Sequence, residues 1–550
     1  MRRSCGSALA LIVALVPGIV MGQPAPKPRA SSDYRESAAV LAHYPALPNV
    51  LLDSPAFRTP EPTLTSQETM LGFLKGLVRD SGHARLGSVG KSRQGRDIPI
   101  VYLTDEGLGD PAAIGRLGRP VVWLLGQQHG NEPAGGEAML ALASALAKGD
   151  LAPLLSKVSV VIVPRVNPDG TAADRRGLSG GADPNRDHLL LGQPEIRALH
   201  QAMQALSPDV VFDHHEFSVA WRWVEKFDAL QRPDVMILEA TNPLIPKALT
   251  EIERGLYRPA LEAAITANGL MPHDYLTTSA DLLDRRVSLG GTAPGIARNT
   301  FGLRGSVSYL IETRGVGIGL QSYQRRVATH YLLAKAVLQT TAADPEGLLK
   351  HLAEARQAAA SDHSDLVLSH KEGEHEIELP LIDPQTGAPK PVKVALVDSR
   401  DVRPVDVRAR PRGYLVLRGG EAVAERLSLN EVRACSVAAA TSIAIEAYDV
   451  TRSATRTNRE AINPDQSVRV RVKTKTINVP VGALFVPVAQ PAAGIVASAL
   501  EPDSPGSYVG VGVIPMTTNE TEAPVYRVMD AAGLSLKPRV GASEALCSAR

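Results

Sequence analysis

Two short stretches of the chain carry side chains that together could hold a metal ion. The first, VVWLLGQQHGNEPAGGE, contains His129 and Glu132. The second, VVFDHHEF, places His214 and His215 at the end of an apolar run. Two imidazoles and one carboxylate suit a catalytic zinc ion, because the fourth coordination position stays open for water. The sequence therefore indicates a metal-dependent hydrolase, with either His214 or His215 as the third ligand.

The residues around the first histidine are typical of a tight loop between a strand and a helix. Gly126, Gly130 and Pro133 surround His129 and Glu132. A helix start leaves backbone N–H groups free and favours a nearby carboxylate. Taken alone, the spacing is equally well explained by a helix-capping glutamate beside a surface histidine. The histidine pair of the second stretch favours the metal site.

A third residue with chemical potential is Glu312, which ends the apolar run SVSYLIE. A carboxylate is unusual at such a position unless it meets a charge or takes part in chemistry. Beside a zinc-bound water, Glu312 could accept a proton as a general base. The alternative is a structural ion pair with Arg314.

The elements that must position these side chains are buried strands alternating with helices. Such alternation predicts an α/β fold with helices on both faces of a sheet. Because ligands bind beyond the carboxyl ends of strands in these sheets, we expect His129, Asn167, His215 and Glu312 to converge there. The expected strands are 98–103, 121–125, 158–163, 209–213 and 306–312, and the expected helices are 134–148, 194–206 and 325–340.

The C-terminal part of the chain has a different character. Short apolar runs such as VKVALV, GYLVL and ALFVPV are separated by Pro and Gly. In residues 468–473, valines alternate with Arg and Lys, which predicts a half-buried strand with one basic face. We interpret that face as solvated rather than as a binding site for an acidic polymer. Residues 346–550 are therefore expected to form a β-rich accessory region.

Bulk composition excludes some partners. The 550 residues include 59 basic and 58 acidic ones, so the net charge is +1. This balance gives no long-range attraction to nucleic acid or to an anionic membrane. A chain of this length accommodates more than one domain.

The N-terminus reads as an export signal. Residues 1–22 have two arginines near the start, a short apolar run, and small residues before Gln23. Residues 23–64 read as a linker and lead-in, and no later run is long enough to span a membrane. We therefore expect a periplasmic or secreted protein without stable membrane insertion after the signal is removed. Only Cys435 and Cys547 then remain, so one disulfide is possible.

The motifs resemble, in order, those of the zinc metallocarboxypeptidase family (peptidase family M14). The resemblance covers about residues 65–345, and it implies a mixed, mostly parallel twisted sheet with helices on both faces. Six ordered matches are more specific than any one of them. They are VGKSRQGRDIPI, GQQHGNEPAG, VNPDG, RGLSGGADPNRD, FDHHEF and YLIETRG.

The resemblance implies a role for each matching residue at the metal. His129, Glu132 and His215 would bind one zinc ion. His215 is chosen over His214 because the bacterial form of the motif reads Asp, any residue, His, Glu. Asp183 would hold the other nitrogen of the His129 ring and so fix its tautomer.

The resemblance also implies substrate contacts. Asn185 and Arg186 would grip the terminal carboxylate of a peptide, for which a guanidinium fork is well suited. Arg176, rather than its neighbour Arg175, would stabilise the oxyanion. Glu312 would be the general base and then the acid that protonates the leaving amine.

Two further features concern specificity. Arg298 falls near the region that lines the side-chain pocket in the family, where a cation would favour an acidic terminal residue. Its alternative is a structural ion pair. The tyrosine that closes over substrate in the digestive members has no match between Tyr275 and Tyr309.

The function predicted from these observations is that of a zinc metallocarboxypeptidase. Its substrate would be a peptide with a free C-terminal carboxylate. One alternative is a zinc amidase or deacylase that acts on cell-wall peptides or N-acyl amino acids. The other is an inactive homologue that only binds peptides.

Overall fold

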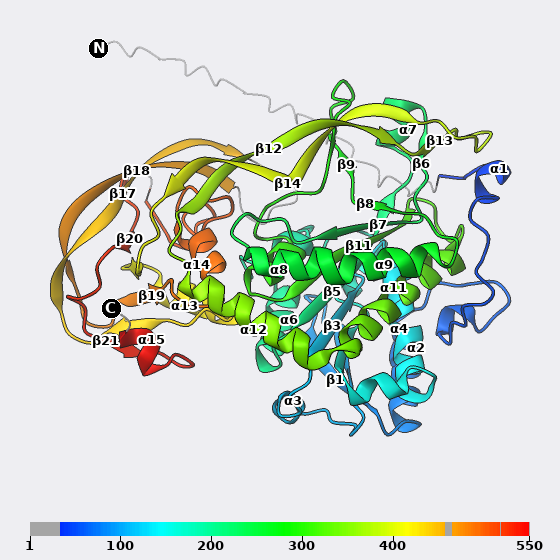
Figure 1. The fold of residues 1–550 in the computed structure, drawn as a ribbon, viewed down its shortest axis with the longest axis horizontal. Coiled ribbons are helices and arrows are strands. Elements are labelled where there is room, and N and C mark those ends of the chain that lie inside the picture. Colours follow the sequence, from blue (N-terminus) through cyan, green and yellow to red (C-terminus); the bar gives the residue numbers. More distant parts are fainter. Residues whose placement is uncertain (1–33, 457–464, 518, 549–550) are drawn as a thin grey trace, which may run out of the picture.

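A mixed eight-stranded sheet forms the centre of the larger part of the molecule (Figure 1). The computed structural model describes residues 34–456, 465–517 and 519–548. The expected signal peptide at 1–22 lies outside the described residues. In spatial order the strands are β1 (Ala84–Lys91), β2 (Asp97–Leu103), β4 (Ser159–Val163), β3 (Val121–Gly126), β5 (Val210–Ser218), β11 (Val307–Val316), β7 (Val235–Glu239) and β8 (Pro272–Asp274).

Parallel pairing dominates the middle of this sheet. Strand β3 pairs in parallel with β4 and β5, and β5 pairs in parallel with β11. Antiparallel pairs join β1 to β2, β2 to β4 and β11 to β7. Both β5 and β11 extend beyond the ends expected from sequence, because their pairing continues past the register partners His215 and Glu312. The predicted mixed sheet is confirmed.

Apolar side chains of β3 point alternately to the two faces of the sheet, which explains why helices cover both of these faces. Val122 and Leu124 belong to one core cluster, whereas Trp123 and Leu125 belong to another on the opposite face. The first face packs against α2 (Gln67–Arg79), α4 (Pro133–Lys148), α9 (Arg258–Thr266), α11 (Tyr323–Ala343) and α12 (Pro345–Ser361). The second face packs against α6 (Pro194–Ala205) and α10 (Ala297–Leu303).

Short elements fill the connections. They are α1 (Ala38–Leu41), η1 (Pro55–Phe57), α3 (Pro111–Gly115), η2 (Ala152–Ser156), α5 (Pro168–Ala172), η3 (Pro184–Arg186), α7 (Arg222–Phe227), α8 (Lys247–Ile252) and η4 (Glu253–Tyr257).

A long two-stranded ribbon extends from the C-terminal region to the part of the molecule that contains the eight-stranded sheet (Figure 1). It consists of β12 (Leu366–Leu379) and β14 (Val392–Arg408), which pair antiparallel. Strand β14 also pairs with β10 (Val287–Ser288), which in turn pairs with β9 (Thr277–Thr278). At the ribbon's tip, β13 (Leu381–Ile382) pairs with β6 (Leu230–Gln231). The division at residue 346 remains a proposal, since strands from both sides of it share these sheets.

The C-terminal region is rich in β structure, as predicted. Its seven-stranded sheet is accompanied by α13 (Gly420–Leu429), α14 (Ala493–Leu500) and α15 (Glu544–Ser548). In β18 the side chain of Val468 is buried and that of Arg469 is exposed, which matches the half-buried strand expected from the alternation. In spatial order the strands are β18 (Asp465–Val479), β17 (Thr441–Arg456), β20 (Val525–Val528), β15 (Gly413–Val416), β19 (Leu484–Pro487), β16 (Cys435–Val437) and β21 (Leu536–Pro538).

The C-terminal region contains a disulfide. Cys435 of β16 and Cys547 of α15 form a disulfide that closes the C-terminal region. Among the described residues, none of the helices combines the length and the apolar character needed to cross a membrane.

Candidate active site

The loop between β3 and α4 brings His129 and Glu132 to the end of the sheet. Gly130 is needed there, because a Cβ atom on it would lie 2.0 Å from the carbonyl carbon of Gly170. Gly135, in the first turn of α4, similarly passes so close to His214 that a Cβ would lie 2.8 Å from that residue's own Cβ. The glycines of this motif therefore seat the loop and helix tightly against their neighbours.

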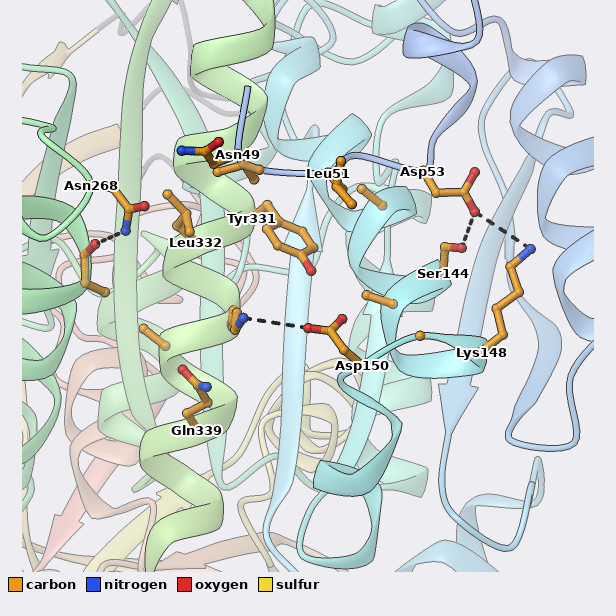
Figure 2. A pocket seen from close by; sticks show the side chains of 17 residues that line it. Asn49, Leu51, Asp53, Ser144, Lys148, Asp150, Asn268, Tyr331, Leu332 and Gln339 are labelled. Carbon is orange, nitrogen blue, oxygen red and sulfur yellow. Dashed lines mark hydrogen bonds and ion pairs between the residues drawn. The ribbon is translucent and has the colours of Figure 1, made fainter. Parts of the chain in front are cut away.

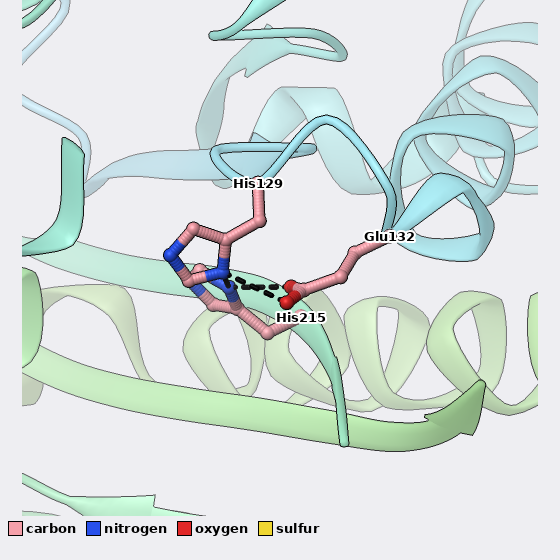
Figure 3. A group of neighbouring side chains, drawn as sticks. All are labelled: His129, Glu132 and His215. Carbon is pink, nitrogen blue, oxygen red and sulfur yellow. Dashed lines mark hydrogen bonds and ion pairs between the residues drawn. The ribbon is translucent and has the colours of Figure 1, made fainter. Parts of the chain in front are cut away.

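Three side chains converge at this point (Figure 3). Nδ1 of His129 lies 2.9 Å from Oε1 of Glu132 and 3.0 Å from Nδ1 of His215. Nδ1 of His215 lies 2.9 Å from the other carboxylate oxygen of Glu132. The potential ligand atoms all lie within 4.8 Å of one another, and all three residues are buried.

The outer nitrogens of both rings are held by carboxylates. Nε2 of His129 lies 3.0 Å from Oδ1 of Asp183, the contact implied by the family resemblance. Nε2 of His215 lies 2.6 Å from Oδ2 of Asp213. Since a carboxylate only accepts, each neutral ring carries its proton on Nε2 and directs the lone pair of Nδ1 inward. Two lone pairs and a carboxylate that face one another fit a zinc ion.

His214 points elsewhere. Its Nδ1 lies 3.0 Å from Nδ1 of His330 on α11, and Nε2 of His330 lies 2.9 Å from Oγ1 of Thr313. Because successive residues of a strand face opposite sides, β5 can direct only one of the two histidines to the cluster. The structure brings His215, rather than His214, to His129 and Glu132.

Electrostatics within the cluster favour a bound cation. Burial alone would raise the pKa of Glu132, but His129 and His215 hold it far below its usual range. Burial alone would lower the pKa of His215, but Asp213 and Glu132 raise it well above the usual value. The cluster therefore keeps its carboxylates ionised and attracts positive charge to the inner nitrogens.

Arg176 reaches the same cluster from the segment after α5. Its Nη2 donates to Oδ2 of Asp183 at 2.8 Å, and its Nη1 lies 3.4 Å from Oε1 of Glu132. Although burial would lower the pKa of Arg176, these two carboxylates raise it. Arg176 is thus a permanent positive charge at the edge of the cluster.

Glu312 faces the cluster from the neighbouring strand. It is the register partner of His215, and it lines a cleft of about 370 Å³ together with Glu132, Arg176, Trp221 and Tyr275. Burial, followed by repulsion from Glu132, raises the pKa of Glu312 to about 8. A carboxyl group with a raised pKa at the wall of a cleft is suited to proton transfer.

Arg314 does not neutralise Glu312. Its two terminal nitrogens donate to the carboxylate of Glu36 at 2.7 and 3.0 Å, and both residues are buried. The alternative interpretation of Glu312, an ion pair with Arg314, is therefore not the arrangement in the structure.

Asn185 and Arg186 occupy η3, next to Asp183. The amide oxygen of Asn185 accepts from the backbone N–H of Ala297 at 2.8 Å, and its Nδ2 lies 3.2 Å from Nε2 of His215. Nη1 of Arg186 donates to the carbonyl of Asn185, while the rest of the side chain is exposed. Of the two residues, Arg186 is the freer to meet a ligand.

Arg298 is buried on α10 and is held by neutral groups. Its Nη2 donates to the carbonyl of Gly291 at 2.6 Å, and its Nε donates to the carbonyl of Glu239 at 3.2 Å. Burial lowers the pKa of Arg298 to about 10. Within the described part of the chain, no carboxylate lies within ion-pairing distance of this guanidinium.

Tyr275 is a candidate that the sequence analysis did not identify. It lines the cleft, and burial followed by the charge of Glu312 raises its pKa. Arg176, Arg186 and Arg298 act on it in the opposite direction. The signal in the sequence is the position of Tyr275 between His215 and Glu312.

A larger cavity, of about 760 Å³, lies between α4, α9 and α11 (Figure 2). Its polar lining includes two ion pairs, Lys148 with Asp53 and Lys335 with Asp150. It contains none of the residues that meet at the metal cluster. The smaller cleft is therefore the candidate site, because its wall includes Glu132 and Glu312.

Comparison with known proteins points to one family. A family model described as zinc carboxypeptidase matches residues 70–200. Carboxypeptidase 2 of Trichophyton rubrum is 30% identical over 521 residues, which span 90% of this chain and 94% of the fungal protein. Carboxypeptidase 2 of Trichophyton equinum is 29% identical over 519 residues, with the same coverage of 90% and 94%.

Similar solved structures overlap only in part. A metallo-carboxypeptidase from Burkholderia cenocepacia has 20% sequence identity and a TM-score of 0.38, and the match covers 50% of this chain and 68% of that one. A metallo-carboxypeptidase from Pseudomonas aeruginosa has 21% identity and a TM-score of 0.37, with 52% and 69% covered. The match to the fungal proteins, which spans 94% of each of them, is the more informative similarity.

Proposed function

Because this chain belongs to the zinc carboxypeptidase family, we propose that it removes single C-terminal residues from peptides, with Glu312 as its general base. The protein is a zinc metallocarboxypeptidase hydrolase. The observation that carries the finer proposal is the pairing of Glu312 with His215 across adjacent strands. That register supports the proposal, because it pairs a carboxyl group of raised pKa with His215, one of the proposed metal ligands.

His129, Glu132 and His215 would hold a single zinc ion. When bound, zinc supplies Lewis acidity that polarises a carbonyl and lowers the pKa of water. Asp183 and Asp213 orient the two imidazole rings and make them better ligands. Removing either carboxylate is expected to weaken metal binding rather than to abolish the fold.

Glu312 would take the proton of the attacking water and later deliver it to the leaving amine. Both transfers need a carboxyl group that changes protonation state near neutral pH. Burial beside Glu132 supports this role, since it raises the pKa of Glu312 to about 8. Arg176 would stabilise the negative charge that develops on the carbonyl oxygen.

Arg186 would bind the terminal carboxylate of the substrate through its exposed guanidinium. Asn185 would support it by fixing the η3 turn, because its side chain already accepts from Ala297 and donates to Asp213. A buried guanidinium without a carboxylate partner is costly and attracts an anion. Arg298 is therefore proposed to favour an acidic C-terminal residue.

We propose an exported location, periplasmic or secreted. The signal-like residues 1–22 support this, and so does the disulfide between Cys435 and Cys547. Disulfides persist in oxidising compartments and are rare in the cytosol.

The test uses the mature, zinc-loaded protein and three substrates. They are a peptide with a free C-terminal carboxylate, the same peptide with a C-terminal amide, and an N-acyl amino acid. Products are identified by mass spectrometry with and without a metal chelator. We expect chelator-sensitive loss of one residue from the free-carboxylate peptide only. Cleavage of the amidated peptide or release of the acyl group would instead indicate an amidase or deacylase.

The base is tested with Glu312→Gln. General-base catalysis contributes about 100 to 10,000-fold, so kcat should fall by that factor while zinc affinity is retained. Equal turnover by the wild type and Glu312→Gln would refute the assigned role. Absence of turnover in both, with zinc bound, would indicate a peptide-binding homologue.

A further inference from the structure

A line of hydrogen-bonded side chains leads away from the metal ligand His215 into the interior. Oδ2 of Asp213 lies 2.6 Å from Nε2 of His215 and accepts from Nε2 of Gln128 at 2.7 Å. Oε1 of Gln128 lies 3.0 Å from Nε2 of His188. Nδ1 of His188 lies 3.0 Å from Nε2 of His200 on α6. All five side chains are buried.

The carboxylate of Asp213 sets the direction of every bond in this line. An ionised carboxylate only accepts, so Gln128 must present its NH₂ group to Asp213 and its oxygen to His188. Nε2 of His188 must then carry the proton, which makes its Nδ1 the acceptor for His200. Burial keeps both rings neutral, because it lowers the pKa of His188 to about 4 and that of His200 well below its usual value.

The far end of the line lies against the C-terminal region. Asn430, which follows α13, is fully buried and donates from Nδ2 to the backbone carbonyl of His188 at 3.1 Å. Asn430 and the backbone of Leu429 also act on His200. One asparagine of the C-terminal region thus bonds the backbone of His188 and lies near enough to His200 to affect its pKa.

The segment around Asn430 makes further polar contacts with the part of the chain that precedes residue 346. Nε2 of Gln204 donates to Oγ of Ser428 at 2.9 Å. Nη2 of Arg304 donates to Oε1 of Glu431 at 2.5 Å, and Arg426 donates to the carbonyl of Leu190 at 3.0 Å. The segment that carries Asn430 is therefore fixed against α6, the end of α10 and the connection at Leu190.

We propose that the C-terminal region positions the metal ligand His215 through Asn430, His188, Gln128 and Asp213. In this role Asn430 and His188 are positioning residues, since neither touches the metal or the substrate. The inference rests on the proposed zinc site, and it assigns to the C-terminal region a part in the affinity and reactivity of that site. Substitution of a residue that holds a metal ligand in place typically lowers metal affinity by about 10 to 100-fold.

The test measures the zinc dissociation constant of the full chain by competition with a chromogenic chelator. His188→Leu removes both hydrogen bonds of the ring and should weaken zinc binding about 10-fold, the lower end of that range. His188→Gln retains one donor and one acceptor and should restore most of the affinity. Asn430→Ala should also weaken zinc binding, and it keeps the test valid if His188→Leu does not fold.

The matched control is Gln204→Ala, which removes two hydrogen bonds to Ser428 in the same interface but outside the line. We expect it to lower the melting temperature without changing the zinc dissociation constant. In the positioning variants kcat should fall with little change in KM, because substrate contacts are intact. Unchanged zinc affinity in folded His188→Leu and Asn430→Ala, or an equal loss in Gln204→Ala, would overturn the inference. Failure of the wild type to bind zinc would refute the proposed function itself.

Discussion

Asp183 joins His129, a proposed metal ligand, to Arg176, which would stabilise the oxyanion, so a substitution at Asp183 separates the two roles. Its Oδ1 contacts Nε2 of His129 at 3.0 Å and accepts from the backbone N–H of Asn185 at 2.8 Å. Its Oδ2 accepts from Nε and Nη2 of Arg176 at 3.2 and 2.8 Å. In Asp183→Asn one oxygen remains, and two donors already require it on the Oδ1 side. The new NH₂ group must then face the guanidinium, which also only donates.

The magnitudes follow from these contacts. His129 keeps its hydrogen bond but loses the charge of its partner, so zinc affinity should fall about 10-fold, the lower end for such partners. That loss equals about 1.4 kcal/mol. Arg176 loses both bonds to Asp183, and misplacing one oxyanion donor costs about 100 to 1,000-fold in kcat. At saturating zinc, only this second effect should remain.

The assay is steady-state hydrolysis of a peptide at increasing zinc concentrations, together with chelator competition. Asp169→Asn is the matched control, because Asp169 is also buried and bonded to an arginine, Arg96, at 2.6 Å. It should lower the melting temperature without changing zinc affinity or kcat. A folded Asp183→Asn with normal kcat at saturating zinc would refute the claim that Asp183 positions Arg176.

Three further predictions concern specificity, stability and pH. Arg298→Gln should reduce kcat/KM for peptides that end in Asp or Glu by about 10-fold or more relative to those that end in Leu, since a desolvated ion pair is lost; an unchanged ratio in competition assays would exclude Arg298 from the pocket. Cys435→Ser should cost about 2 to 5 kcal/mol of stability, measured by urea unfolding, while activity at low temperature is retained. The folded protein keeps His188 neutral with a pKa of about 4, whereas the unfolded chain protonates it near about 6.5. The neutral ring therefore contributes fully to the free energy of unfolding above pH ~6.5, and this contribution is lost as the pH falls towards ~4. Between these pH values the free energy of unfolding of the metal-free wild type should fall by about 1.4 kcal/mol per pH unit more than that of His188→Gln. Equal pH dependence of the two free energies would contradict this prediction.

The metal cluster could be predicted from sequence because its parts lie at strand ends in a recognisable order. His129 and Glu132 share one loop, and a continuous apolar run precedes each of His215 and Glu312. Parallel strands then bring their carboxyl ends to one edge, so that local patterns fix the convergence. The choice of His215 over His214 followed from the family motif, and the side-chain alternation of β5 gives it a physical cause.

The supporting contacts could not be predicted in the same way. His188 and Asn430 lie outside the six motifs, and they meet Gln128 only because distant segments fold together. Glu36 is the partner of Arg314 across an interval of 278 residues, which no local pattern signals. Tyr275 lies in the short connection between β8 and β9, and its place in the cleft depends on tertiary contacts that no local pattern signals.

The ribbon of β12 and β14 sets an order for maturation of the chain. Its tip reaches the N-terminal segment, where Oγ of Ser37 donates to the carbonyl of Gln385 and Nε2 of His43 contacts the carbonyl of Gly387, each at 2.9 Å. These contacts join residues about 350 positions apart, so they form only after most of the polypeptide has been synthesised. A chain stopped at residue 345 would leave its own beginning without these partners. Arg314 would still hold Glu36 in such a chain, so only the protease resistance around Ser37 and His43 should appear late, after the ribbon has docked.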